Sequence, residues 1–239
     1  MENIEVTPIP AFSDNYIWLI NAGERACAVV DPGDAQPVLD YLQDHDLRLE
    51  YILITHHHPD HIGGVAELQA RTGAGVFGAH DSRLPGQTRR FGRGEIVGMP
   101  RLGMQMRVAE IPGHTSTHIA FIGHGMVFCG DTLFSVGCGR LFEGTPGEMQ
   151  ISLDQLGSLP PETRVYCAHE YTLSNGLFAL DVEPDNQDLI RRTEAVRKAR
   201  DAGQPTVPTT IGEELKVNPF LRTREDPVFY AARKRADGV

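Results

Sequence analysis

The sequence predicts an α/β protein in which helices cover sheet layers, followed by a small helical C-terminal domain. Short apolar runs alternate with amphipathic helical patterns through residues 1–169, an alternation typical of α/β proteins. Polar and metal-binding side chains follow the ends of several of these runs. From residue 170 the pattern changes to charged helices. We therefore predict a catalytic α/β domain over residues 1–169 and a helical domain over residues 170–239.

Strands are predicted where short apolar, often β-branched runs are bounded by turn residues. Helices are predicted where apolar side chains recur three or four positions apart, as Val38 and Leu42 do. The expected strands are residues 3–8, 16–21, 26–30, 51–54, 75–79, 106–111, 118–123, 126–129 and 164–168. The expected helices are residues 36–44, 65–72, 148–157, 186–202 and 226–236. Residues 80–104 are rich in Gly, Arg and Pro, and we expect a surface loop there with one strand near 95–98.

The composition is that of a globular protein. The chain has 239 residues, of which 41% are hydrophobic and 23% charged. Its net charge of −10 argues against a general nucleic-acid binder. The start of the chain lacks a basic leader, and no apolar run approaches about 18 residues. We therefore expect a cytosolic protein with no membrane partner, and take a monomer as the default. No Cys-x-x-Cys spacing is present, so buried free thiols are expected at Cys27, Cys129, Cys138 and Cys167.

A cluster of metal-binding side chains directly follows the apolar run at residues 51–54. It consists of His56, His58, Asp60 and His61. Pro59 biases His58 away from helical dihedrals, so the cluster is predicted to be a loop at a strand end. Residues at i and i+2 of an extended chain point the same way, so His56 and His58 can bind one ion. Asp60 and His61 are placed to serve a second ion, and the spacing indicates a dinuclear site.

Three further candidate ligands, His114, Asp131 and His169, each lie at the end of a predicted strand. Imidazole with carboxylate and without thiolate suits zinc, with iron or manganese as alternatives. Two such ions polarise a bridging water, which indicates a hydrolase. Covalent catalysis is disfavoured because no Gly-x-Ser-x-Gly motif is present. His118 is a candidate for orienting one of the ligands.

Residues 55–61 resemble the motif Thr-His-x-His-x-Asp-His of the metallo-β-lactamase superfamily. The remaining motifs resemble the glyoxalase II family, the hydroxyacylglutathione hydrolases. Those motifs are Ile-Pro-Ala-Phe-Ser-Asp-Asn-Tyr at 9–16, Gly-His-Thr-Ser at 113–116, Cys-Gly-Asp-Thr-Leu-Phe at 129–134, Gly-Cys-Gly-Arg-Leu-Phe-Glu-Gly-Thr at 137–145, His-Glu-Tyr-Thr at 169–172 and Asn-Pro-Phe-Leu-Arg at 218–222. The resemblance covers essentially the whole chain.

The resemblance implies an αββα sandwich that holds two divalent metal ions. By position, the first ion is expected on His56, His58 and His114 and the second on Asp60, His61 and His169, with Asp131 bridging. The implied reaction is hydrolysis of S-D-lactoylglutathione and related 2-hydroxyacyl thioesters to glutathione and D-lactate, in methylglyoxal detoxification. Asp60 and Asp131 are expected to act with a metal-held hydroxide. A thiol leaving group, with a pKa of about 8.5, departs without a strong general acid.

The resemblance also implies which residues hold glutathione. The matching positions are Arg140, Phe142 and Tyr171. Phe142 lacks the hydroxyl that a Tyr would bring, which predicts the loss of one hydrogen bond. Arg233 and Lys234 supply positive charge near the C-terminus, although the family's Arg-x-x-Lys pair does not align with them. The sequence departs from the family again at Thr117, where Gly is usual before the second His.

Other readings of the same motifs remain open. An iron-dependent glutathione persulfide dioxygenase has the same fold and a related substrate, and its mononuclear iron uses a subset of these ligands. A β-lactamase or a lactonase also fits the central motif. A binding module that keeps the fold without catalysis is disfavoured, because all of the candidate ligands are present.

Overall fold

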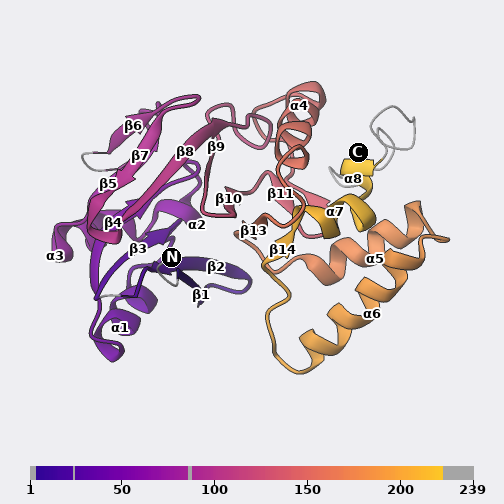
Figure 1. Cartoon of the computed structure of the whole chain (residues 1–239), viewed down its shortest axis with the longest axis horizontal. Coiled ribbons are helices and arrows are strands. Elements are labelled where there is room, and N and C mark those ends of the chain that lie inside the picture. Colours follow the sequence, from indigo (N-terminus) through magenta and orange to yellow (C-terminus); the bar gives the residue numbers. More distant parts are fainter. Residues whose placement is uncertain (1–3, 24, 86–87, 223–239) are drawn as a thin grey trace. The chain divides into compact units, whose positions relative to one another are not determined.

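A computed structural model describes residues 4–23, 25–85 and 88–222 of the chain. The chain forms two compact units, and Figure 1 labels their helices and strands. The first unit comprises Met1–Glu110 and Thr117–His124. The second comprises Ile111–Ser116 and Gly125–Val239. These units divide the chain differently from the predicted boundary at residue 169, which stays a prediction.

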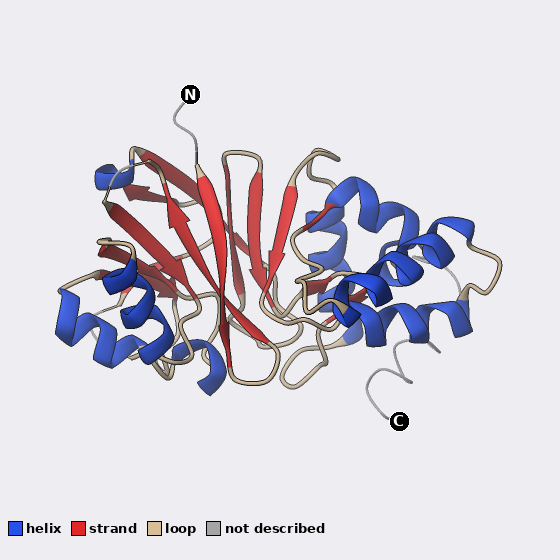
Figure 2. Ribbon diagram, turned by 90° about the horizontal axis from the view of Figure 1, so that it is seen from below, coloured by secondary structure: helices blue, strands red, loops and turns tan. Residues whose placement is uncertain are grey.

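The first unit is built around a six-stranded sheet with its strands in sequence order. The strands are β1 (Glu5–Ala11), β2 (Asn15–Asn21), β3 (Ala26–Val30), β4 (Arg48–Leu53), β5 (Gly75–Ala79) and β6 (Arg89–Phe91). The first three run antiparallel, whereas β3 to β6 run parallel. Parallel neighbours need crossover connections, and helices often form these connections. Here α1 (Gln36–Asp44) and α3 (Val65–Thr72) lie between parallel strands in the chain, and Figure 2 shows the helices in blue beside the red strands.

The core of this unit lies where α1 and α3 pack on the sheet. Val38 of α1 and Leu68 of α3 are fully buried with Ile52 of β4, in one apolar cluster. Every residue of β3 is buried, as expected for a strand covered on both faces. Helix α3 ends at Gly73, whose φ of 73° is the left-handed conformation common at helix ends.

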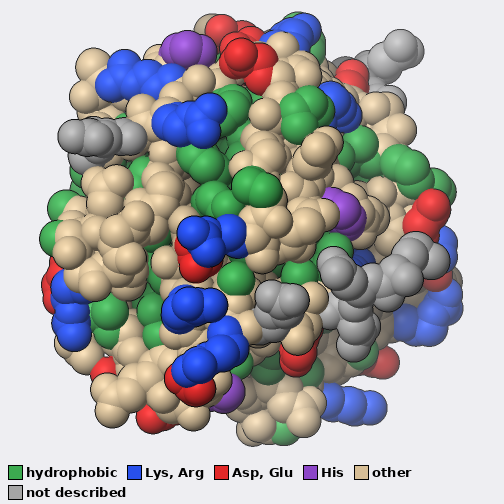
Figure 3. Space-filling view, turned by 60° about the vertical axis from the view of Figure 1, so that its left-hand side comes forward, with side chains coloured by type: hydrophobic (Ala, Val, Ile, Leu, Met, Phe, Trp, Pro, Cys, Tyr) green, Lys and Arg blue, Asp and Glu red, His purple; other side chains and the backbone are tan. Residues whose placement is uncertain are grey.

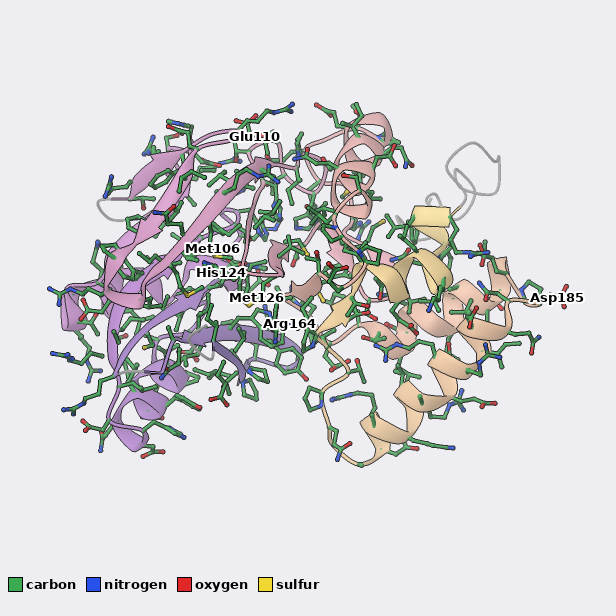
Figure 4. All side chains as sticks on the ribbon, viewed as in Figure 1. Met106, Glu110, His124, Met126, Arg164 and Asp185 are labelled. Atoms are coloured by element: carbon green, nitrogen blue, oxygen red, sulfur yellow. The ribbon has the colours of Figure 1, made fainter. Side chains whose placement is uncertain are left out.

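Residues 80–104 contain more regular structure than the predicted loop with one strand. Besides β6, they hold β7 (Ile96–Met99) and a 3-10 turn, η1 (Pro100–Leu102). Strand β7 pairs antiparallel with β8 (Met104–Glu110), and β8 pairs with β9 (Ile119–Gly123). Side chains of β8 alternate between the core and the surface from Met104 to Val108, so Met106 is buried. Glu110, at the end of the strand, is exposed, and Figure 4 labels both residues. The short β6 was missed because its Arg-rich sequence has no apolar alternation.

The described strands of the second unit have two to five residues. They are β10 (Met126–Gly130), β11 (Leu133–Phe134), β12 (Gly137–Cys138), β13 (Arg164–Cys167) and β14 (Thr209–Thr210). Strand β10 runs parallel to β13, and Met126 faces Arg164 at one end of the pair, as Figure 4 shows. Strands β11 and β12 form a small antiparallel hairpin. Helix α4 (Pro146–Gly157) has Thr145 as its N-cap, in a capping box that Glu148 completes.

Four further helices lie in the described part of the second unit, which ends at residue 222. They are α5 (Thr172–Val182), α6 (Gln187–Asp201), α7 (Ile211–Val217) and α8 (Pro219–Arg222). The sequence predicted α6 but missed α5, α7 and α8. Helix α5 has Ser, Asn and Gly near its start, which weakens its helical pattern. Gly176 lets α5 approach α6 closely, since a Cβ there would lie 2.8 Å from Thr193 Oγ1. The turn joining the two helices carries Asp185, which Figure 4 labels. The predicted helix at 226–236 lies outside the described residues.

No helix within the described ranges is long and apolar enough to cross a membrane. On the face drawn in Figure 3, several Lys and Arg side chains lie against Asp or Glu. Surface ion pairs of the first unit include Arg101 with Glu50, at 3.1 Å. None of the four cysteines, all of which lie in the described ranges, forms a disulfide. Three of them are buried as predicted, whereas Cys138 is partly exposed.

Candidate metal centre

The predicted cluster after β4 lies on an extended segment that turns into a short helix. His58 has extended dihedrals (φ −61°, ψ 145°), which confirms the effect expected of Pro59. The prediction of a loop throughout was wrong, because Pro59 occupies the first position of the short helix α2 (Pro59–Ile62), where it needs no N–H donor. The ring of His56 lies 4.7 Å from His58 and 4.0 Å from His61, between centroids. The first unit thus gathers the predicted ligands of this segment.

Asp31 orients two of these histidines, and sequence reasoning missed it. Its Oδ2 accepts hydrogen bonds from His61 Nδ1, at 3.0 Å, and from Thr55 Oγ1, at 2.7 Å. Thr55 Oγ1 in turn lies 3.1 Å from His56 Nδ1. A proton on each Nδ1 leaves the Nε2 lone pair available to a metal. The signal in the sequence was an Asp directly after the apolar run at residues 26–30.

Asn15 and Gly33 fix the position of Asp60. Asn15 Nδ2 donates to Asp60 Oδ2 at 2.9 Å, and Asn15 is only 8% exposed. Gly33 lies against the backbone of Asp60, because a Cβ at Gly33 would be 1.9 Å from that carbonyl oxygen. Asp60 Oδ2 is 3.3 Å from His61 Nε2. Two donors bound to one zinc at about 2.0–2.2 Å lie at about this separation. Asn15 belongs to a recognised motif, although its role was not predicted.

His118 supports the cluster from a neighbouring strand. Its ring stacks on that of His56 with centroids 4.5 Å apart and planes 18° apart. His118 is buried, and its Nδ1 lies 3.1 Å from the carbonyl oxygen of Ile119. His118 therefore packs against a predicted ligand, and its role in orienting that ligand stays a prediction.

Thr117 contributes a contact that the family's usual glycine could not make. Its hydroxyl donates to Asp81 Oδ2 at 2.5 Å, and Arg83 binds the same carboxylate with its Nε and Nη2. His57 Nδ1 lies 3.5 Å from that oxygen. Burial acts to raise the pKa of Asp81, but the hydrogen bonds from Arg83 and Thr117 outweigh it and lower the pKa well below its ordinary value. Asp81 is therefore a buried carboxylate that holds Thr117 beside the metal-ligand segment.

The second unit holds the other three predicted ligands together. Asp131 Oδ2 lies 3.4 Å from His114 Nε2 and 3.2 Å from His169 Nε2. His114, Asp131 and His169 are each at most 6% exposed. One carboxylate oxygen within reach of two imidazole nitrogens is the arrangement that a bridging ligand requires. Gly113 and Gly130, just before two of the ligands, have φ of 152° and 48°, conformations that favour glycine.

The loop after β12 orients His114. His114 Nδ1 is 2.6 Å from the carbonyl oxygen of Arg140, so the Nδ1–H donates and the Nε2 lone pair faces Asp131. Gly139 lies directly on Asp131, because a Cβ there would be 1.7 Å from the Asp131 carbonyl oxygen. Glu143 accepts hydrogen bonds from the backbone N–H and the hydroxyl of Ser116. These bonds tie the loop after β12 to the loop that carries His114.

Two predicted substrate residues are aromatic neighbours of these ligands. The ring of Tyr171 stacks on His169 with centroids 4.7 Å apart and planes 6° apart. Phe142 is 61% exposed and meets His114 edge-on, with centroids 5.2 Å apart. The guanidinium carbon of Arg140 lies 5.7 Å from the centre of the Phe142 ring. The other two predicted substrate residues, Arg233 and Lys234, lie outside the described residues.

The His and Asp clusters of the chain fit a binuclear metal site by number and by chemistry. The donors are imidazole nitrogens and carboxylate oxygens, a set that suits divalent zinc, iron or manganese. Buried cysteines contribute no thiolate to this set. Burial raises the pKa of the Cys27 and Cys167 thiols to about 12, and that of Cys129 is raised well above its ordinary value, also by burial.

Comparison with protein families identifies the class. Residues 11–169 match the model of the metallo-β-lactamase superfamily, and residues 170–239 match that of the hydroxyacylglutathione hydrolase C-terminus. The chain therefore belongs to the metallo-β-lactamase superfamily and has its fold, followed by the helical C-terminal region that the second model describes. The predicted fold class is confirmed.

Individual relatives identify the family within that class. The chain is 52% identical to the hydroxyacylglutathione hydrolase of Albidiferax ferrireducens, over 96% of this chain and 91% of the relative. It is 49% identical to that of Vibrio campbellii, over 98% and 92%. The chain is a member of the hydroxyacylglutathione hydrolase family, whose members are metal-dependent hydrolases. Both the family and the enzyme class were predicted from the sequence.

Solved structures agree with this fold. The crystal structure of ETHE1 from Myxococcus xanthus matches with a TM-score of 0.69 and 26% identity, over 98% of this chain and 91% of that protein. The structure of TTHA1623 in a di-iron-bound form matches with a TM-score of 0.66 and 26% identity, over 90% of this chain and 100% of that protein.

Proposed function

We propose that this protein hydrolyses S-D-lactoylglutathione, and related S-2-hydroxyacylglutathiones, to glutathione and the free hydroxy acid. The observation that carries the proposal is Asp131 Oδ2, which lies within 3.4 Å of the Nε2 atoms of both His114 and His169. In a chain about half identical to named hydroxyacylglutathione hydrolases, this is the arrangement expected of a carboxylate that bridges two ions. D-lactate would be the product from the lactoyl substrate.

The proposed site holds two divalent ions, with zinc preferred on the basis of the donor set. His56, His58 and His114 would hold the first ion, Asp60, His61 and His169 the second, and Asp131 would bridge them. Within each unit, Nδ1 of His56, His61 and His114 donates a hydrogen bond, which supports this assignment because it leaves Nε2 available to a metal. Iron remains an alternative, since the relative TTHA1623 has a di-iron-bound form.

Two such ions, when bound, supply an activated water near neutral pH and stabilise the oxyanion that forms on attack. Asp60 and Asp131 are assigned a catalytic part because their carboxylate oxygens can accept a hydrogen bond from that water and direct its lone pair. Asn15 holds Asp60 in place, at 2.9 Å. The thiol of glutathione, with an ordinary pKa of about 8.5, then leaves without a strong general acid.

Arg140, Phe142 and Tyr171 are proposed to bind the glutathione part of the substrate. Phe142, exposed and next to His114, offers an apolar surface beside the ligands, and Arg140 offers a cation for a glutathione carboxylate. Tyr171 presents its phenol beside His169. Arg233 and Lys234 are proposed as further cations. The proposal assigns catalysis to residues 1–169 and part of glutathione binding to residues 170–239, in a cytosolic monomer.

The test is turnover of S-D-lactoylglutathione by the purified protein, followed by loss of the thioester and appearance of free thiol. We expect rapid turnover that a chelator abolishes and that added Zn²⁺, Fe²⁺ or Mn²⁺ restores, with metal content measured alongside. Oxygen uptake with glutathione persulfide in the absence of thioester turnover would assign the protein to the dioxygenases instead. Preferential cleavage of a β-lactam or a lactone would also contradict the proposal.

A further inference from the structure

A fully buried carboxylate, Glu214, lies in the second unit away from the proposed metal ligands. It belongs to α7 and has 0% exposure. Burial raises the pKa of Glu214, while its hydrogen-bond donors oppose that change. Buried carboxylates are costly unless their oxygens accept hydrogen bonds, so the partners of Glu214 indicate what it does.

One partner of Glu214 lies in the turn that joins β11 to β12, and two others lie in β14 and at the end of α7. Glu214 Oε2 accepts from the backbone N–H of Val136 at 2.7 Å. Its Oε1 accepts from Thr209 Oγ1 at 2.8 Å. Asn218 is also fully buried, and its Nδ2 lies 2.9 Å from Glu214 Oε2. The same Nδ2 lies 3.2 Å and 3.0 Å from the carbonyl oxygens of Phe134 and Gly137.

The turn itself has a conformation that its sequence does not favour. Val136 has a φ of 61°, and it is the second of the two residues that join β11 to β12. A positive φ at this position of a turn is usually supplied by Gly or Asn, and it is an outlier for a β-branched residue. Such strained conformations persist only where surrounding contacts fix them. Glu214 and Asn218, which follow in α7 and at its end, provide those contacts.

The two ends of this hairpin reach the proposed metal site. Asp131 lies two residues before β11, and Gly139 and Arg140 directly follow β12. Gly139 N–H donates to the carbonyl of Thr132 at 3.1 Å, which closes the base of the hairpin. The Arg140 carbonyl accepts from His114 Nδ1 at 2.6 Å. A shift of the hairpin would therefore move Asp131 and turn the His114 ring.

We propose that Glu214 is a positioning residue for this site: it fixes the strained turn at Val136 and thereby holds the β11–β12 hairpin, which sets the places of Asp131 and His114. The inference rests on the proposed function, because it takes Asp131 and His114 as metal ligands. Glu214 acts through the hairpin and touches neither substrate nor metal.

The test compares Glu214→Gln with Glu213→Gln, a matched change at the preceding, partly buried position of α7. In Glu214→Gln one acceptor oxygen becomes an NH₂ group, which must face either the Val136 and Asn218 donors or the Thr209 hydroxyl, which donates to Glu214 in the wild type. We expect kcat to fall about tenfold or more, since displacements near 1 Å have such effects, with KM within about twofold. Bound metal should also be lost to a chelator about 10–100 times more readily. Glu213→Gln should match the wild type in kcat, in KM and in the loss of bound metal to the chelator.

A second substitution separates positioning from general destabilisation. Val136→Gly, added to Glu214→Gln, gives a turn that adopts a positive φ without strain. If Glu214 fixes the turn, the double variant should recover kcat and metal retention relative to Glu214→Gln. If Glu214 only supports packing, the double variant should be worse, because Val136 is buried and its loss leaves a void.

If Glu214→Gln does not fold, Asn175→Ala tests whether the β11–β12 turn positions the metal ligands. Asn175 is partly exposed and holds the same turn by donating to the Ser135 carbonyl at 3.1 Å. Lower kcat and faster metal loss in a folded Asn175→Ala protein would support positioning, whereas unchanged values would overturn it. Failure of the wild type to hydrolyse S-D-lactoylglutathione would refute the proposed function alone, because metal retention in the variants still tests the role of Glu214.

Discussion

The carboxylate of Asp31 accepts a hydrogen bond from His61 Nδ1, with 3.0 Å between the two atoms. Both side chains are buried, and Asp31 itself has a positive φ of 52°. Asp31 also accepts from the hydroxyl of Thr55, which adjoins His56. One carboxylate thus fixes the orientation of two predicted metal ligands in the first unit.

Asp31→Asn should weaken metal binding. The substituted amide presents hydrogens where His61 and Thr55 now donate, so we expect metal affinity to fall about 10–100-fold. The measurement is metal binding in competition with a chromophoric chelator. Asp44→Asn, at an exposed position of α1, is the matched control and should bind metal as the wild type does. Equal affinities in the two variants would contradict the role assigned to Asp31.

Gly139→Ala should strongly reduce activity. The added Cβ would lie 1.7 Å from the Asp131 carbonyl oxygen and 3.3 Å from His114 Nδ1, so the backbone beside both ligands must move. We expect kcat/KM with S-D-lactoylglutathione to fall about 100-fold, as misplacement near 1 Å produces. Gly147→Ala is the control, because no atom lies within 4 Å of its added Cβ. Comparable kinetics for the two alanine variants would show that the tight contact at Gly139 is unimportant.

Asp81 should make stability depend on pH. Burial opposes ionisation of Asp81, but the bonds from Arg83 and Thr117 prevail and lower its folded pKa. A group with a lowered folded pKa stabilises the protein above its unfolded pKa of about 3.9 and loses that contribution as the pH falls below it. In metal-free protein at pH 7, Asp81→Asn should therefore reduce the free energy of unfolding by about 1–3 kcal/mol.

The difference between wild type and Asp81→Asn should shrink as the pH falls below about 4. Urea unfolding of both proteins at a series of pH values measures this difference in the free energy of unfolding. Asp40→Asn, at an exposed position of α1, serves as the control and should show a smaller difference. A gap between wild type and Asp81→Asn that stays constant down to pH 3 would argue against a lowered pKa.

The thiols should differ sharply in reactivity. Burial raises the pKa of Cys27 and Cys167 to about 12, so at pH 8 roughly one thiol in ten thousand of each is a thiolate, the reactive form. Cys129 is fully buried as well. A thiol-specific chromogenic disulfide should therefore modify only the partly exposed Cys138 quickly in the native protein, and all four cysteines after unfolding. Fast reaction of more than one thiol in the native state would contradict this.

The sequence by itself determined the local parts of this protein. Short apolar strands, the helix predicted over residues 148–157 and the His/Asp motif were readable because strand patterns, helical periodicity and metal-ligand spacing are set by residues close together in the chain. The same short-range pattern carried the family resemblance, which the matches over nearly the whole chain bear out.

Only the tertiary structure decided which distant side chains act on these motifs. Asp31 orients His61 across thirty positions, Asn15 holds Asp60, and Glu214 reaches Val136. Helix α5 was missed because Gly176 has a low helix propensity. The reason for a glycine there is its close contact with Thr193 of α6, which only the folded structure shows. Hydrogen bonds between residues far apart in the chain depend on how the strands and helices pack, and no local spacing encodes them.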